Sequence, residues 1–302
     1  MPPLSHHAAH SAPPLFFCHI PKTGGVLIRY FLRDQFAADE VCDIETWPAL
    51  LQATPDQLRP YRLFQGHFQL DAARLLPPCE RIAFFRPPVE RTLSLLLHLR
   101  RDPNFHELHQ HAKGRSIAEL LNDPLITDSL RNHQTAYMGA QLDLDQARLA
   151  ASHGGQAFDI GAHMSEPSLE LAMANLQRLS VIGLTNQIDA SFAQLCMRYD
   201  FHPRRAYSRR NSASDAERAM LADLSRRELE ILHSLNDLDL QLYDAANTLF
   251  HMQASASPYE QLIGRSLQRR ASRLFSGAAL DLSAPVAGSN WYEAEWNENG
   301  DC

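Results

Sequence analysis

The chain has 302 residues, a formal net charge of −7, 45% hydrophobic residues and 21% charged residues. This length and composition are typical of a globular protein that buries one sizeable core, and the acidic balance argues against general binding to nucleic acid. No apolar run approaches the roughly 18 residues that a membrane-spanning helix needs, so we expect no stable membrane insertion.

The N-terminal segment, residues 1–14, is rich in His, Pro and Ala and is expected to be disordered. It has neither a basic start nor an apolar stretch before Leu15, which argues against a secretory signal and favours a cytoplasmic protein. The five cysteines include no Cys-x-x-Cys pair, as expected for free thiols in a reducing compartment.

The first predicted elements are a buried strand at Leu15–Ile20 and a helix that begins near Val26. The loop between them reads Pro21-Lys22-Thr23-Gly24-Gly25. A glycine loop between a strand and a helix start can bind phosphate through backbone N–H groups, and a lysine adds positive charge. The loop is not a Walker A motif, because its lysine precedes the glycines. An ordinary strand-to-helix turn is the alternative interpretation.

Two further strands are predicted at Arg62–Phe68 and Arg81–Arg86, and a helix follows at Val89–His98. Arg86 stands at the carboxyl end of its strand, where a guanidinium could hold a second phosphate with two parallel hydrogen bonds. Ser94 lies off the centre of the helix's apolar stripe. The alternatives are an arginine in a surface ion pair and an ordinary helix hydroxyl.

The rest of the chain continues the alternation of helices and strands. A strand is predicted at Val181–Thr185, and Ala216–Gln253 has a helical pattern. The alternation predicts an α/β fold with a central parallel sheet flanked by helices over residues 15–253. Residues 254–302 are predicted to form a basic helix at Tyr259–Phe275, followed by a flexible acidic tail.

The two loop segments together resemble the sulfotransferases that use 3′-phosphoadenosine-5′-phosphosulfate (PAPS), in the branch that includes heparan sulfate 2-O-sulfotransferase and its bacterial relatives. His19–Gly25 resembles the family segment that binds the 5′-phosphosulfate. Phe85–Arg91, with Ser94, resembles the segment that binds the 3′-phosphate. Weaker similarities at Asn132–Thr135 and Asn236–Tyr243 extend the resemblance over about residues 15–250.

Two positions depart from the family pattern. Pro87 stands where the family usually has Asp, which removes a carboxylate and leaves the expected phosphate contacts in place. Gln65-Gly66-His67 resembles a family His-Gly-His segment whose second histidine is the base. His67 matches that second histidine, but Gln65 replaces the first, which argues against a mechanism with two histidines from this segment.

The resemblance implies a P-loop-like fold, PAPS as the sulfate donor and no metal. His67 would be the catalytic base, and Lys22 would stabilise the phosphate that leaves. The implied donor-binding residues are Pro21, Lys22, Thr23, Gly24, Gly25, Val26, Arg86 and Ser94. The histidine-rich segments 6–10 and 106–111 lack a complete set of metal ligands and are not interpreted as metal sites.

The acceptor is left open between two kinds of hydroxyl. The resemblance favours a saccharide, such as a cell-surface glycan or a lipo-oligosaccharide, whereas a peptidyl tyrosine before export is the close alternative. Four arginines form a positive patch that could attract an anionic acceptor, close over the nucleotide or be a solvated loop, namely Arg204, Arg205, Arg209 and Arg210. Two other functions remain: a phosphotransferase, for which no Walker A loop is present, and a non-catalytic nucleotide-binding protein. The oligomeric state stays open.

Overall fold

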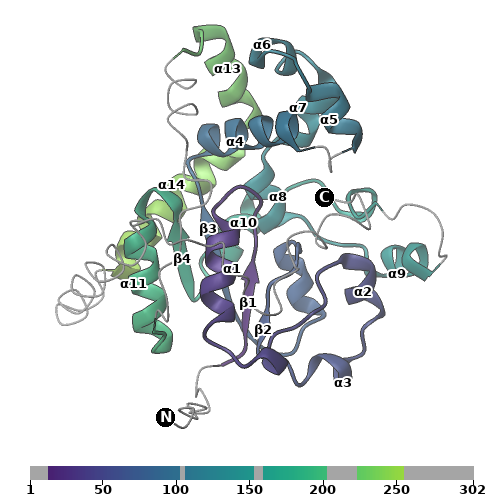
Figure 1. The fold of residues 1–302 in the computed structure, drawn as a ribbon, viewed down its shortest axis with the longest axis vertical. Helices are drawn as coiled ribbons and strands as arrows, with labels where there is room; N and C mark the ends of the chain where they lie inside the picture. The colour runs from purple at the N-terminus through teal and green to yellow at the C-terminus, as the bar shows by residue number, and fades with distance from the viewer. Residues whose placement is uncertain (1–12, 103–105, 153–158, 203–222, 255–302) are drawn as a thin grey trace, which may run out of the picture.

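The computed structural model describes residues 13–102, 106–152, 159–202 and 223–254. These residues form an α/β fold around a four-stranded parallel sheet with the strand order β2-β1-β3-β4 (Figure 1). The strands are β1 Leu15–Cys18, β2 Leu63–Phe64, β3 Glu80–Phe85 and β4 Val181–Leu184. The predicted parallel sheet flanked by helices is therefore confirmed. The arginine patch at 204–210 and the predicted basic helix and tail lie outside the described residues, as does most of the N-terminal segment.

The helices surround this sheet in chain order. They are α1 Gly25–Arg33, α2 Trp47–Gln52, α3 Pro55–Leu58, α4 Pro88–Arg101, α5 His106–Ala112, α6 Ile117–Leu120, α7 Pro124–Leu130, α8 His133–Gly139, α9 Leu144–Ser152, α10 Leu169–Leu176, α11 Ile188–Tyr199, α13 Arg226–Leu235 and α14 Asp237–Ala254. Short 3-10 helices are η1 Ala38–Glu40, η2 Leu70–Arg74, η4 Gly161–His163 and η5 Thr185–Gln187. Within the described part of the chain, no helix is long and apolar enough to cross a membrane.

The register of the strands brings their carboxyl ends to one edge of the sheet. Cys18 of β1 lies opposite Ala83 of β3, and Phe85 of β3 lies opposite Leu184 of β4. The chain turns from β1 toward β2 on one side, whereas β3 and β4 lie on the other side. The strand order thus reverses between β1 and β3, and the carboxyl end of such a reversal is where open α/β sheets bind ligands.

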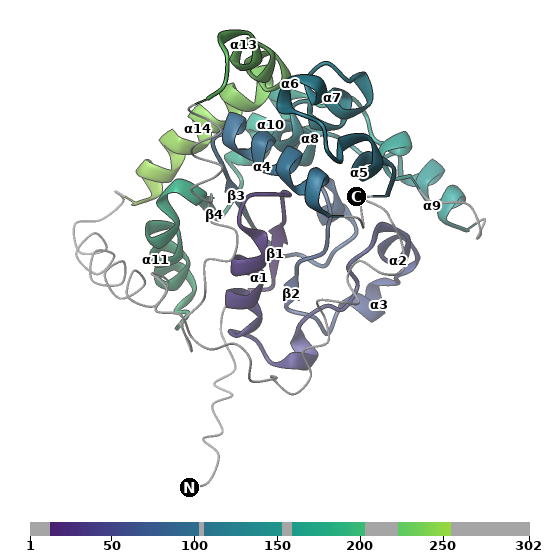
Figure 2. The ribbon, with the colours of Figure 1, turned by 45° about the horizontal axis from the view of Figure 1, so that its top comes forward.

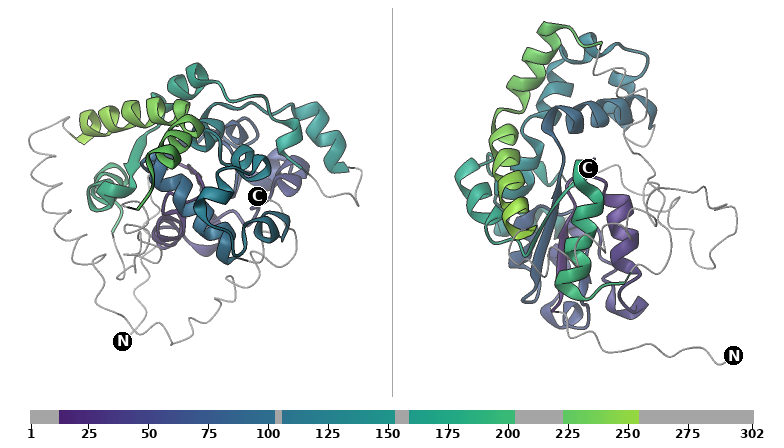
Figure 3. Two further views of the ribbon diagram at one scale, coloured as in Figure 1. Left: turned by 90° about the horizontal axis from the view of Figure 1, so that it is seen from above. Right: turned by 90° about the vertical axis from the view of Figure 1, so that its left-hand side faces the viewer.

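Alternation along the strands builds two cores, one on each face of the sheet. Phe16 and Cys18 pack into the core that α8, α10 and α14 cover, and Leu15 and Phe17 pack into the core beneath α1 and α11. The right-hand view of Figure 3 shows the sheet edge-on, with α14 on one side and α1 on the other. Strands that are buried on both faces read as continuous apolar runs, which is why the sequence located β1, β3 and β4.

A third apolar cluster forms a helical cap above the carboxyl ends of the strands. It is built by α4, α5, α6, α7 and α13 (Figure 2). The helix α4 leaves β3 through Pro87 and Pro88, and proline at the first helical turn removes no intrahelical hydrogen bond. Leu93 and Leu96 of its predicted stripe are buried in the cap.

The strand predicted at Arg62–Phe68 is wrong in length, because only Leu63–Phe64 pairs with β1. The chain leaves the sheet at Gly66, where the Phe68 N–H donates to the Gly66 carbonyl at 2.9 Å. The His67 N–H donates to the Glu45 carbonyl at 3.2 Å, outside the sheet. Turn and loop hydrogen bonds thus replace the strand pairing predicted beyond Phe64. His67 therefore lies in a loop after the end of β2.

Candidate active site

The loop that follows β1 has a strained backbone at its lysine. Lys22 has φ 69° and Gly24 has φ 81°, a left-handed conformation that is costly for any residue with a Cβ, by roughly 1–2 kcal/mol. Thr23 is fully buried, and its hydroxyl donates to the Ile20 carbonyl at 2.8 Å, which closes the loop. The Thr23 contact supports the strained loop, and backbone strain of this kind clusters at functional sites.

The loop delivers the N-terminus of α1 to the carboxyl edge of the sheet. The first hydrogen bond of the helix runs from the Ile28 N–H to the Gly24 carbonyl at 3.3 Å. The preceding N–H groups, of Gly25, Val26 and Leu27, therefore have no carbonyl partner within the helix. With the helix dipole they favour an anion at this point, so the loop has the donor set that a phosphate requires.

Arg86 meets this loop from the neighbouring strand β3. Its Nη1 donates to the Lys22 carbonyl at 3.4 Å, and its Nε lies 3.7 Å from the Glu90 carboxylate. The Arg86 backbone is held by the Gln134 side chain, which accepts from the Arg86 N–H and donates to the Arg86 carbonyl, each at 3.0 Å. The structure thus joins the two predicted phosphate segments at the point where the strand order reverses.

One face of α4 borders the same region. Glu90, Ser94 and His98 are spaced by four residues and therefore lie along one side of the helix. Glu90 pairs with Arg86, and the Lys22 charge is the second cause, after burial, that lowers the pKa of His98 to about 4. Ser94, 4% exposed, lies along the same side of α4, between Glu90 and His98. The role of Ser94 in binding a 3′-phosphate stays a prediction.

His67 lies beside a second histidine, His19, for which the sequence predicted no catalytic role. The ring of His19 is 4.7 Å from the ring of His67, centroid to centroid, and stacks on Phe17 at 5.5 Å. His19 is only 6% exposed, and its Nδ1 is buried with no hydrogen-bond partner among the described residues. Gln65 is also buried, and neither its amide nitrogen nor its amide oxygen has a hydrogen-bond partner among the described residues. These side chains hold unused hydrogen-bonding capacity next to His67, which buried polar groups rarely do unless a ligand or water completes them.

One member of a partly buried ion pair also holds the backbone of His67. Arg29 of α1 pairs with the Glu45 carboxylate at 2.5 Å, and the Glu45 carbonyl accepts the His67 N–H. Burial is the main cause that lowers the pKa of His67 to about 4, and the Arg29 charge adds to it, whereas Glu45 opposes it. His67 is therefore neutral at pH 7, which is the form that can accept a proton.

The described residues contain no group of three or more His, Cys, Asp or Glu side chains that could hold a metal ion. His6, His7 and His10 lie outside those residues. Cys18, Cys42, Cys79 and Cys196 have free thiols.

Arg86 contacts the loop after β1 that holds Pro21, Lys22, Thr23, Gly24, Gly25 and Val26. Ser94 lies in α4, which follows β3, and His67 follows β2, so these residues all come after the carboxyl ends of strands. The sequence predicted no role for Arg29, Glu45, His98 or Gln134, because each acts through a partner far away in the sequence. The one available signal for Gln134 was its place in Asn132–Thr135, which the sequence offered only as a weak similarity. No protein-family model matches the chain, and no curated protein matches its sequence.

Proposed function

We propose that this protein is a sulfotransferase that moves a sulfuryl group from PAPS to an acceptor hydroxyl, giving 3′-phosphoadenosine-5′-phosphate (PAP) and a sulfate ester. One observation carries the proposal: the Lys22 loop and Arg86 meet at the reversal of the strand order, with the neutral imidazole of His67 after the next strand. Two separate anion-binding elements suit a donor with phosphates at two positions.

The donor-binding residues divide into two groups in this proposal. Lys22 and the N–H groups at the start of α1 would hold the 5′-phosphosulfate and stabilise the negative charge that develops on the leaving phosphate. Arg86, fixed by Gln134, and Ser94 would hold the 3′-phosphate and orient the donor. Pro21 begins the loop, Val26 follows it in α1, and both are half-buried.

His67 would take the proton of the acceptor hydroxyl as the new O–S bond forms. The sulfuryl sulfur gains the acceptor oxygen and loses the bond to the phosphate oxygen, which keeps the electron pair. His19 and Gln65 supply further hydrogen-bonding groups beside His67, where they would orient the acceptor or the sulfuryl oxygens.

For the acceptor, the family resemblance favours a saccharide hydroxyl. The feature that favours a peptidyl tyrosine is the burial of His67, which lowers its pKa to about 4. A weak base deprotonates a phenol, with a pKa of about 10, more readily than a sugar hydroxyl.

The test uses purified protein, PAPS labelled with ³⁵S and an extract of the source cells. Label that enters a macromolecule and leaves it with protease as sulfotyrosine identifies a protein-tyrosine sulfotransferase. Protease-resistant label identifies a carbohydrate sulfotransferase. Tight PAP binding with no transfer to any fraction would contradict the enzymatic proposal and favour a non-catalytic nucleotide-binding protein.

His67→Ala is expected to abolish transfer and to keep PAP binding, because the base does not touch the phosphates. A loss of about 100-fold or more is typical for a general base. Lys22→Ala is expected to weaken both binding and transfer. His202→Ala is the matched control, since this histidine is exposed beyond the end of α11. Transfer by His67→Ala at the rate of the His202→Ala control would show that His67 is not the base.

A further inference from the structure

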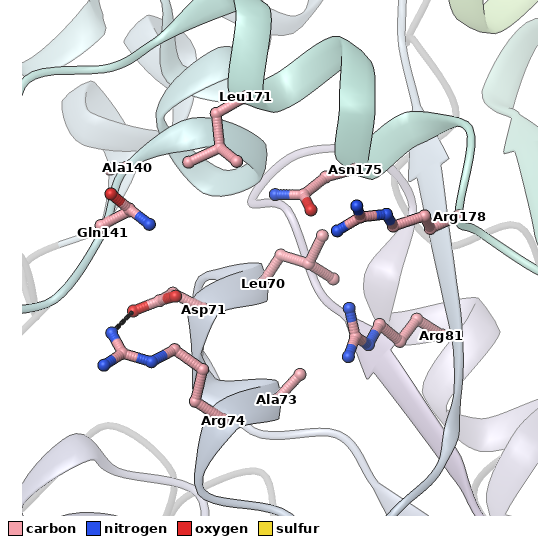
Figure 4. A pocket seen from close by; sticks show the side chains of 10 residues that line it. All are labelled: Leu70, Asp71, Ala73, Arg74, Arg81, Ala140, Gln141, Leu171, Asn175 and Arg178. Carbon is pink, nitrogen blue, oxygen red and sulfur yellow. Dashed lines mark hydrogen bonds and ion pairs between the residues drawn. The ribbon is translucent and has the colours of Figure 1, made fainter.

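A cavity lies at the end of the sheet opposite the candidate active site. It has a volume of about 250 Å³ and is enclosed by η2, the start of β3, the end of α8 and α10 (Figure 4). Arg81 is the second residue of β3, whereas Arg86 follows the last residue of the same strand. Five residues of extended chain separate the two arginines by about 16 Å, so this cavity is distinct from the candidate active site.

Positive charge converges on this cavity from two elements. The guanidinium groups of Arg81, at the start of β3, and Arg178, between α10 and β4, both point into it (Figure 4). Arg81 is half-buried and Arg178 is exposed. Within the described part of the chain, no carboxylate pairs with either of them.

A third arginine at the cavity is already neutralised. Arg74 lies 3.0 Å from the Asp71 carboxylate and also donates to the Leu142 carbonyl at 3.3 Å. Asp71 in turn accepts the Leu142 N–H at 2.9 Å. Since Asp71 is the only carboxylate among the lining residues, the lining keeps two positive charges without a counter-charge. Two like charges that face one small space repel each other, and an anion between them removes that repulsion.

The remaining lining is a mixture of amide and apolar groups. Gln141 and Asn175 face the cavity from opposite sides, and Leu70 and Leu171 form its apolar wall (Figure 4). A cavity with a few convergent polar groups and an apolar wall is the usual form of a small-molecule site. Its volume admits only a small ligand.

We propose that this cavity binds a small organic anion, with its anionic group between Arg81 and Arg178 and its apolar part against Leu70 and Leu171. Guanidinium groups bind phosphate, sulfate and carboxylate alike through paired N–H donors. The proposal does not depend on the sulfotransferase assignment, because none of these residues belongs to the site at the carboxyl edge.

The test measures binding of n-butyl phosphate, butyrate and inorganic phosphate by calorimetry. The protein used carries Lys22→Ala and Arg86→Gln, which remove the two positive side chains proposed to hold the phosphates of the donor. Butyl phosphate is expected to bind this protein more tightly than inorganic phosphate, because only the former reaches the apolar wall. The comparison of butyl phosphate with butyrate decides which anionic group the arginines prefer.

Arg178→Gln, added to the same protein, is expected to weaken butyl phosphate binding by about 10-fold or more, as the loss of a charged hydrogen-bonding partner does. Arg178 is exposed, so this change leaves the fold intact, and Arg81→Gln gives a second, independent test. The matched control is Arg59→Gln, which removes the same charge from an exposed pair with Asp56.

Equal affinity in the Arg178→Gln, Arg81→Gln and Arg59→Gln proteins would overturn the proposal. No millimolar binding to the Lys22→Ala/Arg86→Gln protein would overturn it as well. If the anions then bind only the unaltered chain, they occupy the loop after β1, which would support the proposed function and refute the second site.

Discussion

Two adjacent glycines in the loop after β1 are required for different physical reasons. Gly24 has φ +81°, and the nearest atom that an added Cβ would meet is 3.8 Å away, so its requirement is conformational. Gly25 lies in the helix, but a Cβ there would stand 1.6 Å from His19 Nε2. His19 is packed between Phe17 and His67 and is 6% exposed, so its ring has no room to withdraw.

Gly25→Ala is therefore expected to lower the free energy of unfolding by roughly 1–3 kcal/mol, the usual penalty of overpacking. It should also weaken PAP binding, because the displaced His19 pushes against the loop that holds the donor. Chemical denaturation and calorimetry with PAP measure the two effects.

The His19→Ala background provides the control for this clash. Removing the imidazole makes room for the new methyl group, so the penalty of Gly25→Ala should shrink by about 1 kcal/mol or more in the double variant. A penalty of the same size in both backgrounds would show that steric conflict with His19 is not the reason for the glycine.

At the scale of elements, α8 fixes the end of β3 through a single side chain. Gln134, fully buried at the start of α8, makes both backbone hydrogen bonds of Arg86, as another strand would do. The start of α8 is itself held by α14. The Asp239 carboxylate accepts the N–H groups of Gln134 and Thr135, and Asn132 Oδ1 accepts those of Leu238 and Asp239. The two helices thus cap each other and position Arg86.

Gln134→Leu is expected to destabilise the protein by about 2–4 kcal/mol, because it leaves two buried backbone groups of Arg86 unpaired. It should also weaken PAP binding, since the Arg86 backbone is no longer fixed. Gln194→Leu is the matched control, because Gln194 is buried in α11 and its amide donates to the Phe250 carbonyl at 3.3 Å. The control should lose stability and keep its affinity for PAP. Equal losses of affinity in both variants would argue against a positioning role for Gln134.

The same elements show what the sequence could predict. Short-range patterns found β1, β3, β4, α1 and α4, because apolar runs and prolines act over a few residues. The same patterns overestimated the length of β2. Its predicted pairing beyond Phe64 is replaced by hydrogen bonds to Glu45 and within the turn at Gly66. The pairing of Asn132 with α14 joins positions about 105 residues apart, which no local pattern encodes.

The candidate site likewise contains residues that the sequence predicted and residues that it did not. The Lys22 loop, Arg86, Ser94 and His67 lie within motifs, and the parallel sheet explains why these motifs meet. The supporting groups carry no local signature, because each makes its contact with a different element: Arg29 with Glu45 and Gln134 with Arg86. His19 stood in the first motif, yet its contact with His67 depends on the path of the chain after β2.

At the scale of the whole molecule, several neutral histidines are built into the fold. Burial is the main cause that lowers the pKa of each: to about 4 in His67 and His98, to about 3 in His133, and well below its usual range in His19. In the unfolded chain these imidazoles regain a pKa near 6.5. Between about pH 6.5 and pH 4 the unfolded chain therefore binds more protons than the folded protein.

The sign of the stability change follows from this difference. Stability falls as the pH drops below about 6.5, by up to about 1.4 kcal/mol per pH unit for each histidine, and these histidines add no slope above that pH. Asp239 acts in the opposite sense. Burial is the main cause that raises its pKa, so just above pH 3.8 the folded protein retains more of that proton than the unfolded chain does. Among the described residues, this one carboxyl group opposes the four imidazoles, whose own contribution to the slope is positive below about pH 6.5.

His133 gives the sharpest test, because it lies outside the proposed catalytic groups and its Nε2 is buried without a partner among the described residues. His133→Gln should flatten the dependence of the free energy of unfolding on pH by up to about 1.4 kcal/mol per unit between pH 4 and 6.5. His202→Gln, at an exposed position, should leave the slope as it is. Denaturant titrations at half-unit steps of pH measure all three proteins. If the slopes of the His133→Gln and His202→Gln proteins coincide, the proton uptake arises elsewhere in the chain, and the neutral state of His133 is not what couples folding to pH.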